Sequence, residues 1–277
     1  MTIEAKIIAD SISAEGNRLT TLQLRMHRFI LPEFNTHRAF SRNTRSERAV
    51  PVKKLIEEVR NSPAMPIHWG KNQPGMQAHE ELTAIRITSA KDFWRSAAWQ
   101  AADYAEELAN LGLHKQIANR VLSPFTWAHT LVTATEFSNF FALRRHEDAQ
   151  PEIRALADAM HDAMQASKPE NLKPGQWHLP YVLNSERNDY TLETCIKLSV
   201  ARCARVSYEP FDGNASVEKE LERYELLVGA VPLHASPAEH QGTPDEYCAQ
   251  FGWDHQEDHG NFRGWRQFRK MLPGECQ

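Results

Sequence analysis

The residues best suited to binding chemistry lie in one stretch, residues 36–48 (THRAFSRNTRSER), called the basic stretch below. Guanidinium groups, hydroxyls and an amide follow one another there, and such donors suit phosphate and carbonyl oxygens. Phe29, Ile30 and Leu31 precede it and can anchor it on a rigid element. Charge runs are also common on solvated loops. Composition alone therefore leaves two interpretations open, an anion-binding segment and an exposed basic loop.

The overall composition narrows the classes of partner. The 277 residues are 41% hydrophobic and 25% charged with a formal net charge of −4, which fits one large domain or two smaller ones. A local basic cluster in an acidic protein suits a small anionic ligand better than a nucleic acid. No apolar run approaches the roughly 20 residues of a membrane span, and the N-terminus lacks the pattern of a signal peptide. We therefore expect a cytoplasmic protein with no nucleic-acid or membrane partner.

The cysteines and histidines give no strong sign of a metal site. The four cysteines form no CxxC pair, and we expect them to be reduced thiols. The spacing of His240, Cys248, His255 and His259 matches no usual zinc pattern. We expect no metal.

The elements around the basic stretch follow from hydrophobic periodicity. Residues 3–10 and 22–26 alternate and predict strands joined by a turn at Gly16-Asn17. The second strand is expected to continue through residues 29–31 and so to deliver the basic stretch. Residues 52–59 predict a short helix. Residues 62–75, with their prolines and glycines, predict a loop of the kind that often forms a lid or an oligomer contact.

A second candidate segment lies between residues 89 and 145. Apolar residues spaced three and four apart predict a helix from Ser89 to Gly112, whose aromatics suit a core or a subunit contact. A short helix at 114–120 and a strand at 131–133 follow. Thr133 and Thr135 can cap a helix that carries Asn139 and Arg144, about 140° apart on helical geometry. These two side chains would grip different parts of a ligand.

The rest of the chain alternates helical patterns with polar segments. Residues 153–164 predict an amphipathic helix with Pro151 in its first turn. The polar, proline-containing residues 167–190 are interpreted as a linker. Helices are expected at 192–207 and 217–228, followed by the segment 234–240 (HASPAEH) and a Trp/Arg-rich tail, 260–270.

The basic stretch resembles the signature of flavin-dependent thymidylate synthases, in which R-H-R-x-x-S continues as x-N-E-x-S-x-R-Y. The positions that keep this pattern are His37, Arg38, Ser41, Asn43, Ser46 and Arg48. The positions that depart from it are Thr36, Thr44 and Ala49, which stand where the family has Arg, Glu and Tyr.

Two further matches support the resemblance. Residues 133–144 (TATEFSNFFALR) and 148–154 (DAQPEIR) are similar to the family's N-A-R-x-x-x-N-F-x-x-L-R and H-A-Q-x-E-I-R, although Thr133, Thr135 and Asp148 replace Asn, Arg and His. Residues 204–208 (ARVSY) and 234–240 look like A-R-V-S-Y and H-x-S-P-F-E-H, which precede R-H-R in the family but follow it here.

The altered order identifies the chain as a divergent, phage-like and circularly permuted relative, since permutation is tolerated where termini lie at the surface. On this interpretation residues 1–166 match the family's second half, 167–190 form a linker, and 191–277 match the first half, together one catalytic domain. The resemblance implies an α+β protomer, a mixed sheet packed with long helices, and a homotetramer with active sites between subunits.

The resemblance also implies the reaction and its cofactors. The family methylates dUMP to dTMP, with methylenetetrahydrofolate as carbon donor, FAD as hydride carrier and NADPH as reductant. The residues that would bind FAD are His37, Arg38, Asn43, Asn139, Ser207 and Ser236. Ser46, Arg48 and Arg120, which is similar to the family's Arg before V-L-P, would bind the nucleotide phosphate and sugar. Arg144 would lie against the pyrimidine and favour its anionic form, and His234 would lie near flavin and folate.

The departures from the pattern open alternatives. The family's nucleotide-contacting Gln falls at Glu33, while residues 265–269 (WRQFR) look like a second copy of R-Q-W-F-R. We hypothesise that Arg266, Gln267 or Arg269 folds back to supply the missing donors, with Gln267 binding substrate. The same changes could indicate another pyrimidine such as dCMP, a hydroxymethyl product, or a non-catalytic flavin- or nucleotide-binding homologue. An RNA-binding module is disfavoured by the acidic balance and the few stacking aromatics.

Overall fold

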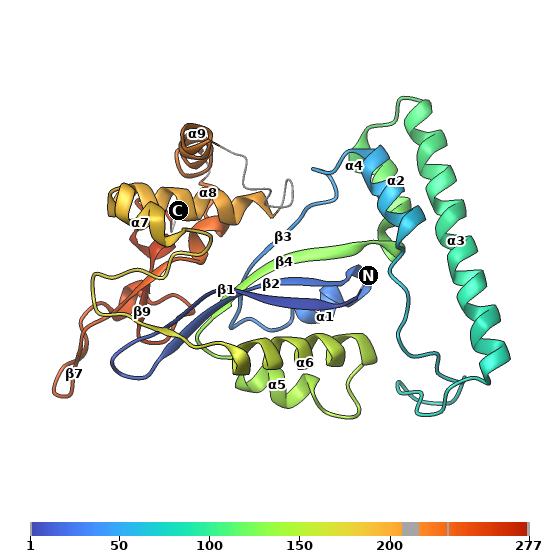
Figure 1. Ribbon diagram of the computed structural model, residues 1–277, viewed down its shortest axis with the longest axis horizontal. Helices are drawn as coiled ribbons and strands as arrows, with labels where there is room; N and C mark the ends of the chain where they lie inside the picture. The colour runs from blue at the N-terminus through green and yellow to red at the C-terminus, as the bar shows by residue number, and fades with distance from the viewer. Residues whose placement is uncertain (1, 207–215, 232, 276–277) are drawn as a thin grey trace.

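A five-stranded sheet lies at the centre of the computed structural model, which describes residues 2–206, 216–231 and 233–275 (Figure 1). The strand order is β3-β4-β2-β1-β5, antiparallel except for the parallel pair β1 and β5. The predicted α+β class with a mixed sheet is therefore confirmed. The strands are β1 (Glu4–Ile12), β2 (Arg18–His27), β3 (Ser41–Thr44), β4 (Trp127–Ala134) and β5 (Glu170–Asn171).

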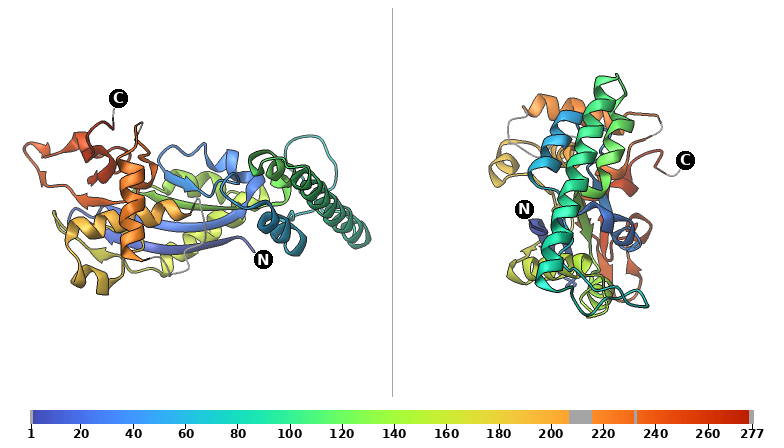
Figure 2. Two further views of the ribbon diagram at one scale, coloured as in Figure 1. Left: turned by 90° about the horizontal axis from the view of Figure 1, so that it is seen from above. Right: turned by 90° about the vertical axis from the view of Figure 1, so that its right-hand side faces the viewer.

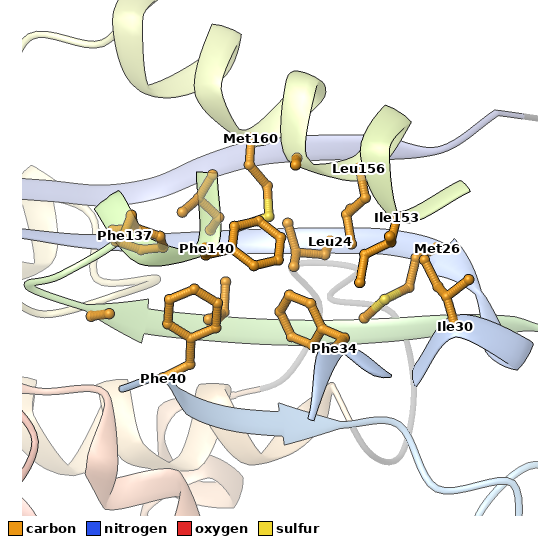
Figure 3. Packing of buried hydrophobic residues seen from close by; sticks show 14 of the residues in the cluster. Leu24, Met26, Ile30, Phe34, Phe40, Phe137, Phe140, Ile153, Leu156 and Met160 are labelled. Carbon is orange, nitrogen blue, oxygen red and sulfur yellow. The ribbon is translucent and has the colours of Figure 1, made fainter. Parts of the chain in front are cut away.

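One face of the sheet carries the main apolar core. Strand β2 turns Leu22, Leu24 and Met26 to this face, because alternate side chains of a strand point to opposite sides. Helix α6 (Pro151–Ala166) lies across it, and α5 (Ser138–Arg144) inserts Phe140 beside Phe34 of the short helix α1 (Leu31–Phe34) (Figure 3). This packing holds α5, and with it Arg144, at a fixed place below the sheet.

The opposite face of the sheet carries a buried polar network. Thr21 Oγ1 hydrogen-bonds Thr133 Oγ1 at 2.7 Å and His178 Nε2 at 2.8 Å. Ser11 Oγ lies 2.9 Å from His178 Nδ1, and Thr133 Oγ1 lies 2.8 Å from His240 Nδ1. These five side chains are buried, so this hydroxyl–imidazole chain ties segments around residues 178 and 240 to three strands.

The C-terminal part of the chain covers this polar face (Figure 1). Cys203 and Val206 pack on Leu131 of β4, and the indole of Trp265 donates to the Asn17 carbonyl at 3.0 Å. Residues 167–190, expected as a linker, carry buried Trp177, His178 and Leu179 and so belong to this layer. Its elements are α7 (Asn184–Asp189), α8 (Leu192–Arg205), α9 (Val217–Val228) and the strand pairs β6 (Gly242–Pro244) with β9 (Trp265–Gln267) and β7 (Tyr247–Cys248) with β8 (Gly252–Trp253).

Helices α2 (Val52–Asn61) and α3 (Ala84–Asn110) project beyond one end of the sheet (Figure 2). Leu55 and Val59 pack against alanines of α3, whose small side chains allow close approach. The short helix α4 (Lys115–Ala118) and a 3-10 helix, Asn119–Phe125, return the chain to β4. No helix in the described ranges is long and apolar enough to cross a bilayer.

Three sequence predictions of local structure are wrong. Strand β2 ends at His27, and residues 28–34 form helical turns, because Pro32 fits the start of a helix. Helix α3 begins at Ala84 and not at Ser89, whose hydroxyl donates to the Ile85 carbonyl 3.2 Å away inside the helix instead of capping its start. Thr133 lies in β4, and Glu136, not a threonine, accepts the Ser138 N–H at 2.7 Å where α5 begins.

Candidate active site

A cavity of about 450 Å³, the basic cavity, opens between the basic stretch and the C-terminal part of the chain. Asn43 lies on β3, and Ser46 and Arg48 lie in the turn that follows it. His234 and Ser236 line the opposite side, at the start of the 3-10 helix Ser236–Glu239. Five predicted site residues from two distant segments therefore line one cavity.

The charge of this cavity suits an anion. Arg48 and Lys115 are its charged lining residues, and no carboxylate from the described part of the chain lines it. Hydroxyls of Ser46 and Ser236 add donors that suit phosphate oxygens. Lys115 and Gln116 were not among the predicted site residues. In the sequence, only their position close to the motif residue Arg120 could have indicated a role in the site. The tertiary fold brings α4 to the cavity, and this placement is not visible in the sequence.

Hydrogen bonds between distant segments fix the walls of the basic cavity. Asn43 Nδ2 donates to the Cys203 carbonyl at 2.7 Å, which joins β3 to α8. Asn119 Nδ2 donates to the carbonyls of Glu47 and Val50 at 2.8 and 2.9 Å and so holds the turn that carries Ser46 and Arg48. Asn43 and Asn119 are buried. The amide of Asn43, predicted to hold a cofactor, here also has a structural partner.

Arg144 lies in a different cavity, the acidic cavity, of about 1110 Å³. Its Nη1 donates to Glu33 Oε1, and its Nε donates to His37 Nε2 at 2.9 Å. His37 also packs its ring edge-to-face on Phe140, with centroids 4.8 Å apart. Among the described residues, none lines both cavities. The structure thus brings Arg144 to His37 and separates it from Arg48.

His37 is held in its neutral form. Burial lowers its pKa, and the nearby charges of Arg144 and Arg42 lower it further. Because Nε2 accepts the Arg144 hydrogen bond, the ring proton belongs on Nδ1. His37 therefore orients the guanidinium group without adding a positive charge beside it.

The remaining predicted site residues lie outside the two cavities or outside the described residues. Arg38, Asn139 and Arg120 are exposed and line neither cavity. Ser207 lies outside the described residues. The roles predicted for these residues stay predictions.

The C-terminal tail does fold back onto the basic stretch. Gln267 is buried, and its Nε2 donates to Ser41 Oγ at 3.2 Å and to Asn261 Oδ1 at 2.8 Å. Arg266 pairs with Asp258 at 2.7 Å, and Arg269 pairs with Glu239. The tail therefore reaches Ser41, while its two arginines are bound to carboxylates of the same chain.

Three histidines of the C-terminal part make structural contacts. His255 Nδ1 and His259 Nε2 lie 3.1 and 2.9 Å from the two oxygens of buried Asp245, while His240 binds Thr133. Burial opposes ionisation of Asp245, but hydrogen bonds from His255 and His259 and from the backbone N–H groups of His255 and Glu246 outweigh it and lower the pKa of this carboxyl group. No cluster of three or more His, Cys, Asp or Glu side chains that could hold a metal ion occurs in the described ranges.

Comparison with known families identifies the class of protein. A sequence model of the thymidylate synthase complementing protein family matches residues 18–170, more than half of the chain. The chain belongs to this family. It is a thymidylate synthase-like methyltransferase that acts on a pyrimidine nucleotide. The family match contains β2, the basic stretch, β4, α5 and α6, and it ends before α8 begins at Leu192.

Solved structures also resemble part of this chain. A UMP/dUMP methylase, PolB, from Streptomyces cacaoi, bound with 5-Br dUMP, matches with a TM-score of 0.47 and 18% identity over 58% of this chain and 89% of its own. Thymidylate synthase X (ThyX) from Helicobacter pylori, with FAD and dUMP, matches with a TM-score of 0.38 and 15% identity over 53% and 67%. A search of curated proteins finds no match.

Proposed function

We propose that this member of the thymidylate synthase complementing family methylates dUMP to dTMP, using methylenetetrahydrofolate, FAD and NADPH. The observation that carries the proposal is the basic cavity. It unites Ser46 and Arg48 of the basic stretch with His234 and Ser236 of the segment 234–240. These are the segments whose sequence motifs resemble the flavin-dependent enzymes, and side chains that act together must lie together.

The donors of the basic cavity fit a phosphate-bearing ligand. A phosphate monoester carries about −1.5 to −2 charges at neutral pH, and Arg48 with Lys115 supplies a formal charge of +2. The volume of about 450 Å³ suits a phosphate with its sugar but does not enclose a whole dinucleotide. His37, Arg38, Asn43, Asn139, Ser207 and Ser236 would hold the flavin, which supplies hydride transfer when bound.

Arg144 would act on the pyrimidine from the acidic cavity. Its guanidinium group is positioned by Glu33 and His37, and a fixed cation stabilises negative charge that develops on the ring. The ring becomes a better carbon nucleophile as that charge develops. His234, exposed at the rim of the basic cavity, would lie beside the flavin and folate.

A second candidate substrate is dCMP, and Glu33 is the observation that favours it. Its carboxylate neutralises part of the Arg144 charge and can accept a hydrogen bond from an exocyclic amino group.

We also propose a homotetramer with shared sites. Two features support it: the predicted residues are divided between two cavities, and Phe93 and Tyr104 of α3 and Leu111 at its C-terminal end are exposed.

The test begins with the purified protein, which should bind FAD and be yellow. Anaerobic NADPH should bleach the flavin absorbance, and addition of methylenetetrahydrofolate with dUMP should give dTMP; dCMP is assayed in parallel. Arg144→Lys keeps the charge but loses the forked donor geometry, so we expect a lower kcat with flavin binding retained. A protein that never binds flavin would overturn the proposal.

A further inference from the structure

The acidic cavity differs sharply in charge from the basic cavity. Its described lining includes five carboxylates, on Glu33, Glu147, Asp148, Glu152 and Asp158, against two guanidinium groups, on Arg144 and Arg154. Asp158 is also paired with Arg145 at 2.8 Å. When the charge of Arg145 is counted with those of the lining residues, the carboxylates still outnumber the guanidinium groups. Such a cavity repels phosphate and favours an uncharged or cationic ligand rich in N–H donors.

Glu33 and Arg144 together form an acceptor beside a donor at the wall of this cavity. Their ion pair uses Oε1 of Glu33 and Nη1 of Arg144, and Arg144 Nε is engaged by His37. Within the described part of the chain, Oε2 of Glu33 and Nη2 of Arg144 have no hydrogen bond. Both side chains remain partly accessible, at 35% and 19%. The pair can therefore accept one hydrogen bond from a ligand and donate another.

Aromatic side chains in the wall of the acidic cavity offer surfaces on which a flat ring can pack. Phe29 and Trp94 line it and meet edge-to-face, with centroids 6.5 Å apart. The Trp94 indole is fixed by its hydrogen bond to the Ala64 carbonyl at 2.9 Å. Glu152, buried in the wall, accepts the Ile67 N–H at 2.9 Å and holds the loop that contains Pro66 and His68. Aromatic faces and fixed polar groups are typical of small-molecule sites.

We infer that the acidic cavity binds a planar heterocycle through an amino group adjacent to a ring nitrogen, with the amino group donating to Glu33 and the ring nitrogen accepting from Arg144. The inference rests on the proposed function, because the ring would belong to one of its substrates. Two rings share this edge: the cytosine of a pyrimidine nucleotide and the pterin of the carbon donor. In both cases Glu33 is a specificity-determining residue.

The hydrogen-bonding edge of a uracil ring complements the acidic cavity less well than the amino-bearing edge of cytosine or pterin. Its single N–H lies between two carbonyl oxygens, so one oxygen must face the carboxylates when the N–H meets Glu33. An amino group instead presents two N–H donors to a carboxylate-rich wall. The matched negative probes are therefore the 4-oxo analogue of cytosine, which is uracil, and the 2-oxo analogue of the pterin.

Binding of ring compounds without phosphate or glutamate tests the inference directly. Calorimetry would compare 2′-deoxycytidine with 2′-deoxyuridine, and a tetrahydropterin with its 2-oxo analogue, on the purified protein with and without added FAD at pH 7.5. A hydrogen bond to a charged group contributes about 1.5–3 kcal/mol, so one amino compound should bind roughly tenfold or more tightly than its oxo partner. The pair that shows the preference identifies the source of the ring.

Two variants assign that preference to a residue. Glu33→Gln should reduce the amino preference to less than about threefold, because the amide can also donate to an oxo group. Glu57→Gln removes an exposed carboxylate of α2 that lines neither cavity and should leave the preference above threefold. Equal binding of the amino and oxo compounds by the wild-type protein, absence of binding by all four, or an unchanged preference in Glu33→Gln would each overturn the inference.

The outcome is separable from that of the proposed function. A protein that methylates dUMP but shows no amino preference contradicts this inference only. A protein that shows the Glu33-dependent preference but never turns over contradicts the proposed reaction only.

Discussion

Arg48 and Lys115 are the side chains that give the basic cavity its charge. Arg48 follows β3 within the basic stretch, and Lys115 begins α4, where its Nζ lies 3.3 Å from the Ala49 carbonyl. Each side chain keeps access to water, so neither carries the large desolvation cost of a buried charge. Cations of this kind contribute most when a doubly charged anion bridges them.

Loss of either cation should weaken nucleotide binding. Arg48→Gln and Lys115→Gln each remove one charge-assisted contact, worth about 1.5–3 kcal/mol, which corresponds to roughly a tenfold to hundredfold rise in Kd. The measurement is calorimetric titration with a pyrimidine nucleoside monophosphate. Lys53→Gln, on the exposed side of α2, is the matched control and should bind like the parent. Equal losses in all three variants would indicate only a general effect of net charge.

Helix α5 is the element that connects the apolar core to the candidate chemistry. It carries Asn139 in its first turn and Arg144 in its last, and Phe140 anchors it between Phe34 and Phe40, with centroids 5.8 and 5.3 Å away (Figure 3). Phe140 also supports the His37 ring that orients Arg144. One buried side chain therefore holds both partners of a predicted catalytic contact.

Phe140→Ala should both destabilise the protein and loosen Arg144. Truncation of a buried Phe costs about 3–5 kcal/mol, and the cavity it leaves permits α5 and His37 to shift. We expect a lower urea midpoint together with a reduced kcat at temperatures where the variant is folded. Phe137→Ala is the comparison, since Phe137 packs on Phe40 but makes no ring contact with His37 among the described pairs. If both variants lose the same fraction of kcat, Phe140 does not position the site.

At the scale of the whole molecule, the hydroxyl–imidazole chain joins the sheet to the C-terminal layer. Burial lowers the pKa values of His178 and His240 to about 3, so both rings are neutral in the folded protein at ordinary pH. In the unfolded chain the same rings titrate near 6.5. Between these values the unfolded state binds more protons than the folded state, and stability must fall as the pH falls.

The contribution of these two histidines to the free energy of unfolding should therefore be complete above pH 6.5. The free energy of unfolding should decline as the pH is lowered toward 3. Each histidine contributes up to about 1.4 kcal/mol per pH unit. His178→Gln should lower stability at pH 7, because Ser11 and Thr21 lose a buried partner, and should also flatten the pH dependence. Urea unfolding between pH 5 and pH 8 measures both effects. Exposed His79→Gln should retain the parent slope; an unchanged slope in His178→Gln would contradict the assignment.

Assembly is the other property at this scale. Phe93, Tyr104 and Leu111 lie eleven and seven residues apart, close to whole helical turns, so they share one stripe along α3 and just beyond it. The α2–α3 arm projects beyond the sheet (Figure 2), and the three side chains of this stripe are exposed. Exposed apolar side chains that line up in this way are typical of protein interfaces.

The double variant Phe93→Glu with Tyr104→Glu should shift the protein from tetramer to smaller species in sedimentation experiments. Like charges placed in a self-complementary interface repel one another and desolvate poorly. The urea midpoint of the dissociated protomer should remain close to that of a control pair of changes at exposed Arg86 and partly exposed Lys91. A parent protein that sediments as a monomer would contradict the proposed assembly.

The sequence by itself determined the strands β1 and β2, most helices and the class of the protein. These follow from local periodicity, turn residues and short motifs, which depend on neighbours in the chain. Local rules failed at residues 28–34, at the start of α3 and at the start of α5. At these places a proline or a polar side chain is compatible with more than one local structure.

Only the tertiary structure decided how the candidate residues are grouped. It placed Ser46 and Arg48 with His234 in one cavity, added Lys115, and sent Arg144 to Glu33 and His37 in another. The physical reason is that these groupings depend on how the sheet and its two layers pack, through buried contacts such as Asn43 with Cys203. Spacing along the chain carries no information about such contacts.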